Sequence, residues 1–285
     1  MKNNVLPTKI GEFTKYTKTP NAIKYGTLYT REVKMDVPFE QKRTLRVYLP
    51  EDFDPNKRYP VIYMCDAQNI VDKYTSAYGE WDFDECMHKL IKNGYRSVMV
   101  VGLDCPKKVN NRIREYTMNK AHFNSKTQFL GYGDRYANYI VNVIKPMIDE
   151  TFPTEVDREW TAFGGSSMGG LCAFDIVSLH PETFYFSLSF SPAFFVLKGN
   201  EYKKEISKRT FYPNEQKYYF FTGGADLDAK IMPGTIKMYN YMKKLGFDND
   251  HVALLVDTER GHCEASWSHY LYDAMTFWLK KIRRT

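Results

Sequence analysis

Thr161-Ala-Phe-Gly-Gly-Ser-Ser-Met-Gly-Gly170 is the segment from which the architecture of this 285-residue chain can be inferred. It contains a G-x-S-x-G pattern, in which a strand turns sharply into a helix and lifts the hydroxyl of the central residue, Ser167, out of the fold. Residues 160–163 predict a short apolar strand, and residues 171–179 predict a helix that ends at His180-Pro181. So short a pattern also fits a plain strand-to-helix turn without a catalytic serine. Other parts of the sequence are needed to distinguish the two interpretations.

The other apolar runs predict an α/β fold. Alternating Leu45, Val47 and Leu49 indicate a half-buried strand at 43–49, paired antiparallel with one at 27–37. Nearly continuous apolar runs indicate central parallel strands covered on both faces. They occupy 59–65 and 97–103, and further strands are expected at 184–190, 217–222 and 252–257. Helices are expected at 81–91, 134–150 (kinked by Pro146), 235–245 and 267–282, the last with a stripe of Leu271, Met275, Trp278 and Ile282.

Strands that alternate with helices predict a mostly parallel central sheet with antiparallel N-terminal strands and helices on both faces. We find no composition break, linker or internal repeat. We therefore expect a polar surface arm over residues 1–26 and a single domain over 27–285. Residues 104–133 show little periodicity and follow a central strand, so this loop is expected to form part of a site.

Composition excludes several classes of function. The net charge of +6 is spread along the chain, with no long Lys/Arg run and no zinc-finger spacing, so no nucleic-acid partner is expected. No apolar stretch is long enough to span a membrane. The five cysteines are odd in number and form no C-x-x-C pair, which favours a reducing compartment. The N-terminus shows no signal peptide, so we expect a cytoplasmic protein; a signal peptide already removed leaves secretion as the alternative.

A catalytic serine needs a base, and the base needs an orienting acid. In a fold of this kind the acid and then the histidine follow later strands. His262 alone among the six histidines lies in a short glycine-containing loop just after a late strand. Asp226, directly after the 217–222 strand, is the first choice for the acid. Asp228 is the second choice and Asp257 the third, and each could instead form a turn or cap a helix.

An oxyanion hole requires two backbone N–H groups aimed at the developing negative charge. Met168, the residue after the serine, should supply one of them. The second should come from the loop after the 59–65 strand, where Gln68 is the first choice and Ala67 the alternative.

Seven motifs in order resemble the esterase D-like (putative esterase) family of α/β-hydrolases. They are Tyr59-Pro-Val-Ile-Tyr-Met-Cys-Asp-Ala-Gln-Asn69, Asn111-Arg-Ile-Arg-Glu-Tyr-Thr117, Gly164-Gly-Ser-Ser-Met-Gly-Gly170, His180-Pro-Glu-Thr-Phe184, Ser189-Phe-Ser-Pro192, Gly223-Gly-Ala-Asp226 and Gly261-His-Cys-Glu-Ala-Ser-Trp267. The family includes enterochelin esterases, feruloyl and acetylxylan esterases, and S-formylglutathione hydrolases. The resemblance covers about residues 27–279 and implies the α/β-hydrolase fold with a triad of Ser167, Asp226 and His262.

The resemblance also implies substrate contacts. Arg112 and Glu115 match an Arg-x-x-Glu pair that would shape the pocket through an ion pair, with an exposed surface pair as the alternative. Trp267 is expected to bind substrate. The chain departs from the family at Ala67, where glycine is frequent and which could narrow the oxyanion turn, and at Val143, where glutamate is frequent.

These observations predict a serine carboxylic-ester hydrolase that needs no metal or organic cofactor. By resemblance, its substrate is a small-molecule or oligosaccharide ester, acetylated or feruloylated on carbohydrate. Siderophore lactones, acyl transfer to a sugar, and a non-catalytic carbohydrate-binding module on the same fold are the alternatives. The sequence leaves the acyl group, the alcohol and the oligomeric state open.

Overall fold

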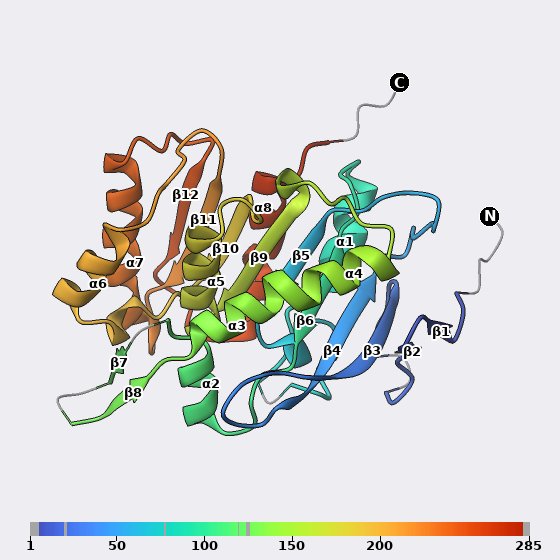
Figure 1. Ribbon diagram of the computed structural model, residues 1–285. Helices are drawn as coiled ribbons and strands as arrows, with labels where there is room; N and C mark the ends of the chain where they lie inside the picture. The colour runs from blue at the N-terminus through green and yellow to red at the C-terminus, as the bar shows by residue number, and fades with distance from the viewer. Residues whose placement is uncertain (1–5, 20–21, 77, 119, 124–125, 282–285) are drawn as a thin grey trace.

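The computed structural model describes residues 6–19, 22–76, 78–118, 120–123 and 126–281. A ten-stranded sheet runs through the molecule with helices on both sides (Figure 1). Its strands are β1 (Lys9–Ile10), β2 (Phe13–Lys15), β3 (Thr27–Lys34), β4 (Lys42–Leu49), β5 (Val61–Met64), β6 (Met99–Leu103), β9 (Thr161–Ser166), β10 (Phe186–Phe190), β11 (Lys217–Gly223) and β12 (Val252–Asp257). A separate hairpin is formed by β7 (Lys120–His122) and β8 (Gln128–Leu130).

The strand order is β1-β2-β3-β4-β6-β5-β9-β10-β11-β12. The pairs from β1 through β4 to β6 are antiparallel, and every pair from β6 through β5 to β12 is parallel. The carboxyl ends of β9, β10, β11 and β12 therefore all lie at the same edge of the sheet, which is where α/β folds bind ligands.

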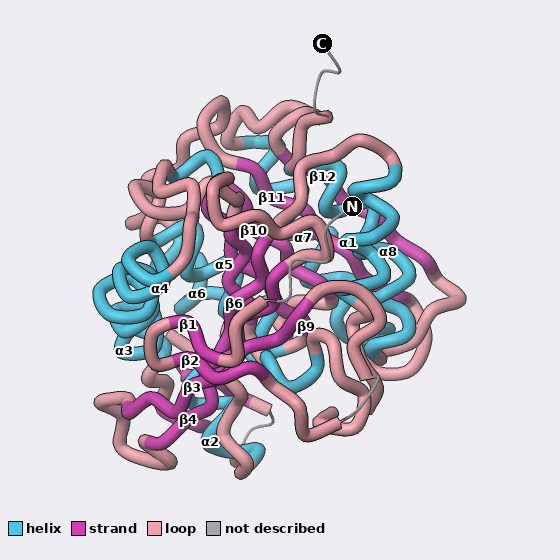
Figure 2. Tube along the Cα trace, turned by 90° about the vertical axis from the view of Figure 1, so that its right-hand side faces the viewer, coloured by secondary structure: helices cyan, strands magenta, loops and turns pink. Residues whose placement is uncertain are grey.

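Two apolar layers cover the two faces of the sheet. The helices are α1 (Phe83–Lys92), α2 (Val109–Glu115), α3 (Gly133–Tyr139), α4 (Lys145–Thr151), α5 (Met168–Leu179), α6 (Gly199–Ile206), α7 (Asp228–Lys244) and α8 (Glu264–Trp278). Side chains of α3, α4, α5 and α7 pack on one face. Helices α3, α4 and α5 are seen in front of the sheet in Figure 1. Side chains of α1 and α8 pack on the other, and the two helices lie together in Figure 2. None of the described helices is long and apolar enough to cross a membrane.

The predicted α/β class and the parallel core are confirmed. Each strand expected from an apolar run is present, with ends shifted by a few residues, and β12 has the expected bounds of Val252–Asp257. Leu271, Met275 and Trp278 of the expected α8 stripe are buried, and Ile282 lies outside the described residues.

The N-terminal segment differs from the expected surface arm. Within residues 1–26, β1 and β2 extend the antiparallel edge of the sheet, and the Phe13 side chain is 0% exposed. Phe13 packs edge-on against Phe152 with ring centroids 5.2 Å apart. The segment is polar overall, so one buried aromatic gave too weak a periodic signal to predict a strand.

Proline misled two helix predictions. Pro146 follows a π-helical turn, Ile140–Ile144, that joins α3 to α4, so the expected irregularity is a widened turn. Helix α7 begins at Asp228, seven residues before the expected start, and contains Pro233. Proline usually ends a helix, which is why the prediction began only after it. The loop at 104–133 contains α2 and the β7–β8 hairpin.

Candidate active site

Ser167 occupies the sharp turn between β9 and α5. Its backbone angles are φ 60° and ψ −123°, a conformation that few side chains adopt without strain. Backbone groups at and after the end of β10 hold this turn in place. Ser167 N–H donates to Phe190 O at 2.9 Å, and Ser167 O accepts from Ala193 N–H at 3.0 Å. A Cβ at Gly165 would lie 2.7 Å from the backbone of Gly169, so a side chain there would force the elbow apart.

His262 faces a buried carboxylate that belongs to Asp228. The distance between His262 Nδ1 and Asp228 Oδ1 is 2.7 Å, and the Asp228 side chain is 0% exposed. The other oxygen, Oδ2, accepts from Ser191 Oγ at 2.8 Å and from Gly223 N–H at 2.9 Å. A carboxylate with all these donors is fixed in orientation and can in turn fix the tautomer and direction of the imidazole.

The carboxylate beside His262 is therefore not that of Asp226, the first choice, but that of Asp228, the second choice. Asp226 is exposed, has a left-handed φ of 53°, and its carboxylate lies against Gly261. Asp257 accepts from Tyr270 Oη at 2.6 Å and from Glu259 N–H at 3.0 Å. Neither forms a hydrogen bond to His262 within the described chain. The second choice, Asp228, occupies the acid position beside His262.

Trp267, which was expected to bind substrate, contacts both Ser191 and His262. Its side chain is buried, its Nε1–H donates to Ser191 Oγ at 3.0 Å, and its ring lies edge-on to the His262 ring at 5.1 Å. Ser191 links Trp267 to Asp228, since its hydroxyl accepts from Trp267 and donates to Asp228. Ser191 belongs to the Ser189-Phe-Ser-Pro192 motif and follows β10, but no role was predicted for it from the sequence.

Ser167 makes no side-chain hydrogen bond within the described part of the chain. Its approach to His262 is set by the sheet, because Phe190 O binds Ser167 N–H and the next residue, Ser191, binds the acid. Hydrogen bonds between a serine and its base are often long before substrate is bound, so the lack of one among the described residues is compatible with catalysis.

The expected oxyanion donors lie on the two sides of the elbow. Met168 is the first residue of α5, where an amide has no partner within the helix. Ala67 and Gln68 lie in a single 3₁₀ turn, Ala67–Asn69, after β5. In this turn the amides of Asn69 and Ile70 bind Asp66 O and Ala67 O, and no acceptor among the described residues binds the amide of Gln68.

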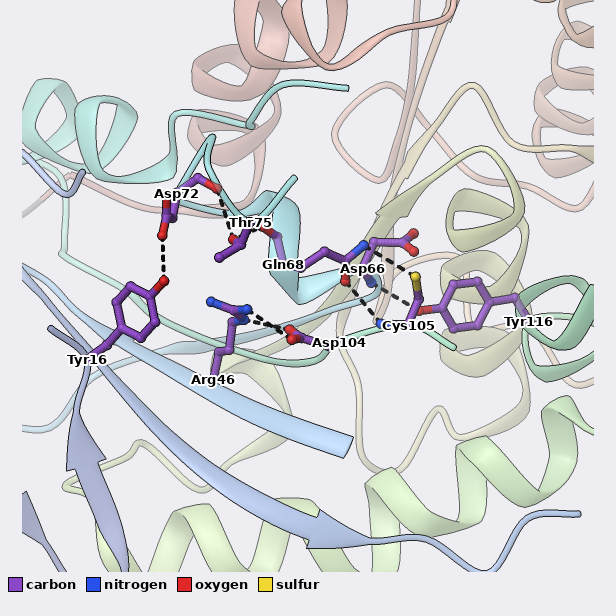
Figure 3. Close-up of polar contacts among 9 residues, drawn as sticks. All are labelled: Tyr16, Arg46, Asp66, Gln68, Asp72, Thr75, Asp104, Cys105 and Tyr116. Atoms are coloured by element: carbon purple, nitrogen blue, oxygen red, sulfur yellow. Dashed lines mark hydrogen bonds and ion pairs between the residues drawn. The ribbon is translucent and has the colours of Figure 1, made fainter. Parts of the chain in front are cut away.

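Side chains hold this turn from several directions (Figure 3). Gln68 Oε1 accepts from Cys105 N–H at 3.0 Å, and Gln68 Nε2 lies 3.3 Å from Cys105 Sγ. Gln68 O accepts from Thr75 Oγ1 at 2.6 Å, and Asp66 N–H donates to Tyr116 Oη at 3.0 Å. Burial raises the pKa of the Cys105 thiol, so it stays protonated and is a poor nucleophile.

Arg112 and Glu115 do not pair with each other. Arg112 binds Asp66 through both Nε at 2.7 Å and Nη2 at 2.8 Å. Burial acts to lower the pKa of the guanidinium, but Asp66 acts in the opposite direction and the pKa is raised. Glu115 binds Arg43 at 2.7 Å, and both side chains are almost fully buried. Burial raises the pKa of Glu115 to about 7, and Arg43 acts in the opposite direction. The expected Arg112–Glu115 pair is thus replaced by two separate ion pairs, and Glu115 lies within the protein.

Asn69 and Glu264 form a contact that the sequence analysis missed. Asn69 Nδ2 donates to Glu264 Oε1 at 3.0 Å, and both residues are buried. Glu264 lies two residues after His262, in the first turn of α8. The bond therefore joins the segment that carries His262 to the Ala67–Asn69 turn, which we call the oxyanion turn because it contains the expected donor Gln68. Residues 195 positions apart leave no local signal for such a pair.

Among the described residues, no group of three or more His, Cys, Asp or Glu could hold a metal ion.

Comparison with known proteins gives a consistent set of relatives. The ferri-bacillibactin esterase BesA of Bacillus subtilis is 22% identical over 204 residues, which cover 66% of this chain and 68% of the relative. The feruloyl esterase module from Clostridium thermocellum, solved with sinapinate, matches with a TM-score of 0.66 and 17% identity, covering 95% of this chain and 96% of the module.

The enterobactin esterase FES from Shigella flexneri matches with a TM-score of 0.64 and 14% identity, covering 87% of this chain and 59% of that protein. At these identities the solved structures show the fold alone. The family model described as "Putative esterase" matches residues 37–217, which is more than half of the chain. This chain therefore belongs to the Putative esterase family of α/β-hydrolases and is a carboxylic ester hydrolase.

Proposed function

We propose that the chain is a serine esterase in which Ser167, His262 and Asp228 form the triad. The observation that carries this proposal is the 2.7 Å contact between His262 Nδ1 and buried Asp228 Oδ1, at the sheet edge where Ser167 is held with φ 60°. A serine, a base and an oriented acid converging in this way are what acyl transfer to a hydroxyl requires.

In the first step His262 Nε2 removes the Ser167 proton while Oγ attacks the ester carbonyl carbon. The carbonyl oxygen becomes negative and accepts hydrogen bonds from the amides of Met168 and Gln68. The bond to the alcohol oxygen then breaks, and the imidazolium gives its proton to that oxygen. Water repeats the sequence on the acyl-enzyme, which releases the acid and restores Ser167.

The proposed substrates are acetyl or feruloyl esters of carbohydrate. The match to a feruloyl esterase module solved with sinapinate supports an aromatic acyl group. A siderophore lactone is the second candidate, favoured by the 22% identity to a ferri-bacillibactin esterase over 66% of the chain. The cytoplasmic location expected from the cysteines and N-terminus stays a prediction.

The test is hydrolysis of p-nitrophenyl acetate, butyrate and ferulate by wild type and Ser167→Ala. We expect kcat/KM to fall by about 10³-fold or more in the variant, because the nucleophile is gone. The neighbouring serine supplies a matched control: Ser166→Ala removes a buried hydroxyl one residue away and should change the rate by less than about threefold. Equal rates for wild type and Ser167→Ala would sink the proposal.

The ranking of rates selects the acyl group, and ferric bacillibactin as a further substrate tests the siderophore alternative. Adding a sugar acceptor during hydrolysis separates the hydrolase from an acyltransferase. A hydrolase releases all of the acyl group as free acid, whereas a transferase yields acylated sugar.

A further inference from the structure

Two cavities flank the β7–β8 hairpin, beside the helix that contacts the elbow region. The first measures about 550 Å³ and the second about 410 Å³, sizes typical of small-molecule sites. The first is lined by Lys108, Val109, Asn110, Asn111, Arg114 and Phe129. The second is lined by Met118, Lys120, Leu130, Leu197, Lys198, Tyr202, Lys204 and Glu205. Phe129 and Leu130 are neighbours on β8 and point to opposite sides, so one strand separates the cavities.

Among the described residues, the lining of the first cavity includes two cations, Lys108 and Arg114, and no acid. The Glu40 carboxylate lies beside it and accepts from Asn111 Nδ2 at 3.0 Å. Within the described chain, the hydrogen-bond acceptors of Arg114 are two uncharged oxygens, Leu130 O at 3.1 Å and Tyr132 Oη at 2.6 Å. The Lys108 ammonium has no ion pair within the described chain. The carboxylate of Glu40, at the start of α2, accepts from the amides of Lys107 and Lys108 at 2.7 and 3.2 Å. Arg114 and Lys108 are therefore available to an anionic ligand.

The second cavity repeats this pattern. Among the described residues, its lining contains three lysines and one acid, Glu205. Glu205 already pairs with Lys208 at 2.8 Å. Lys120, Lys198 and Lys204 form no ion pair within the described residues. An anion in either cavity thus meets cationic side chains that form no ion pair among the described residues.

Apolar surface accompanies the charges. Val109, which is 68% exposed, lines the first cavity together with Phe129, and Leu130, which is 55% exposed, lines the second. Exposed apolar and aromatic side chains at a cavity wall suit the C–H faces of a ring, while amides such as Asn110 suit its hydroxyls. This combination fits a hydroxylated ring that carries a carboxylate better than it fits a free inorganic anion.

Helix α2 connects the first cavity to the site. Arg112 binds Asp66 from this helix, and Asp66 Oδ2 would lie 3.1 Å from a Cβ placed on Gly169 of the elbow. Lys108, Asn111 and Arg114 of the same segment line the cavity. The same short helix therefore borders the first cavity and holds Asp66 beside the elbow.

We propose that these two cavities bind the alcohol side of the substrate, and that this is a carboxylated oligosaccharide built of uronate sugars. The inference rests on the proposed function for the ester bond itself. Carboxylates of successive sugars contact Lys108 and Arg114 in the first cavity and Lys120, Lys198 and Lys204 in the second, with the ring faces on Phe129 and Leu130.

The test measures binding without catalysis. Ser167→Ala protein is titrated by calorimetry with trigalacturonate and with neutral galactotriose. We expect at least about tenfold tighter binding of the charged trisaccharide at low salt, and loss of most of this difference at about 0.5 M salt. Lys108→Glu and Lys198→Glu should each weaken trigalacturonate binding by about fivefold or more.

Lys57→Glu is the matched control. It makes the same change in net charge on an exposed residue that precedes β5, at the opposite end of the sheet. It should leave binding within about twofold. Equal binding of the two trisaccharides, or an equal loss in Lys57→Glu, would overturn the proposal.

Tighter binding of the ferric complex of 2,3-dihydroxybenzoylglycine, with the same sensitivity to Lys108→Glu, would also overturn it in favour of a catecholate ligand. The proposed serine-esterase function is tested separately, by comparing the hydrolysis of nitrophenyl esters by wild type and Ser167→Ala. Binding to the Ser167→Ala protein does not depend on that result.

Discussion

At the scale of single residues, the site depends on backbone conformations that most side chains avoid. Six non-glycine residues of the described chain have positive φ. Four of them follow strands of the parallel core: Asp66 after β5, Ser167 after β9, Ser191 after β10 and Asp226 after β11. Each such conformation costs about 1–3 kcal/mol and persists only where packing imposes it. Their concentration at one edge of the sheet identifies that edge as the functional one.

Asp228 rather than Asp226 should be the acid that supports His262. Asp228→Asn keeps the size of the side chain but removes its charge, and should lower kcat by about 10³- to 10⁴-fold. Asp226→Asn should change kcat by less than about threefold, because that carboxylate is exposed and points elsewhere. Steady-state hydrolysis of one nitrophenyl ester by the two variants checks this. A fall in Asp226→Asn as large as in Asp228→Asn would contradict the assignment.

At the scale of elements, the oxyanion turn is positioned by other parts of the fold. Cys105 after β6 binds Gln68, Arg112 of α2 binds Asp66, and Glu264 of α8 binds Asn69. A short turn cannot hold itself to within a fraction of an ångström, so these contacts supply the preorganisation.

The Asn69–Glu264 bond should set the distance between the oxyanion turn and the His262 segment. Glu264→Ala is expected to lower kcat by about tenfold or more with little change in KM, because misplacement of the donors weakens binding of the transition state only. Glu264→Gln retains an acceptor for Asn69 Nδ2 and should restore most of kcat. Burial raises the pKa of Glu264, so a neutral side chain is tolerated there.

Asn69→Ala combined with Glu264→Ala provides the control. If the two residues act through their mutual bond, the double variant should be no slower than the worse single variant. Effects that multiply would show that each residue acts separately.

At the scale of the whole molecule, the N-terminal strands belong to the domain. Phe13 is fully buried, and Tyr16 Oη donates to Asp72 Oδ2 at 2.8 Å in the loop that follows the oxyanion turn (Figure 3). The antiparallel edge of the sheet thus reaches the loops around the site.

Phe13→Ala should lower the free energy of unfolding by about 3 kcal/mol, as for other buried aromatic truncations. Urea unfolding of the complete chain measures it, and Phe13→Leu, which refills most of the volume, should lose less than half as much. A loss below about 0.5 kcal/mol would show that the segment is an independent arm, as its sequence suggested.

The sequence by itself determined the features that depend on local pattern. Apolar runs located the parallel strands, and G-x-S-x-G located the turn, since a nucleophile elbow needs small residues within five positions. His262 was identified because a short glycine-containing loop after a late strand is also visible locally.

Only the tertiary structure decided which side chains meet. Asp226 is closer to β11 in sequence, but its left-handed backbone turns the carboxylate toward Gly261, whereas Asp228 at the start of α7 faces Ser191 and His262. Arg112 pairs with Asp66, and Asn69 with Glu264, across 46 and 195 residues. Periodicity reports which face of an element is buried, but partners so distant in sequence are chosen by the packing of the whole chain and the backbone angles that it imposes.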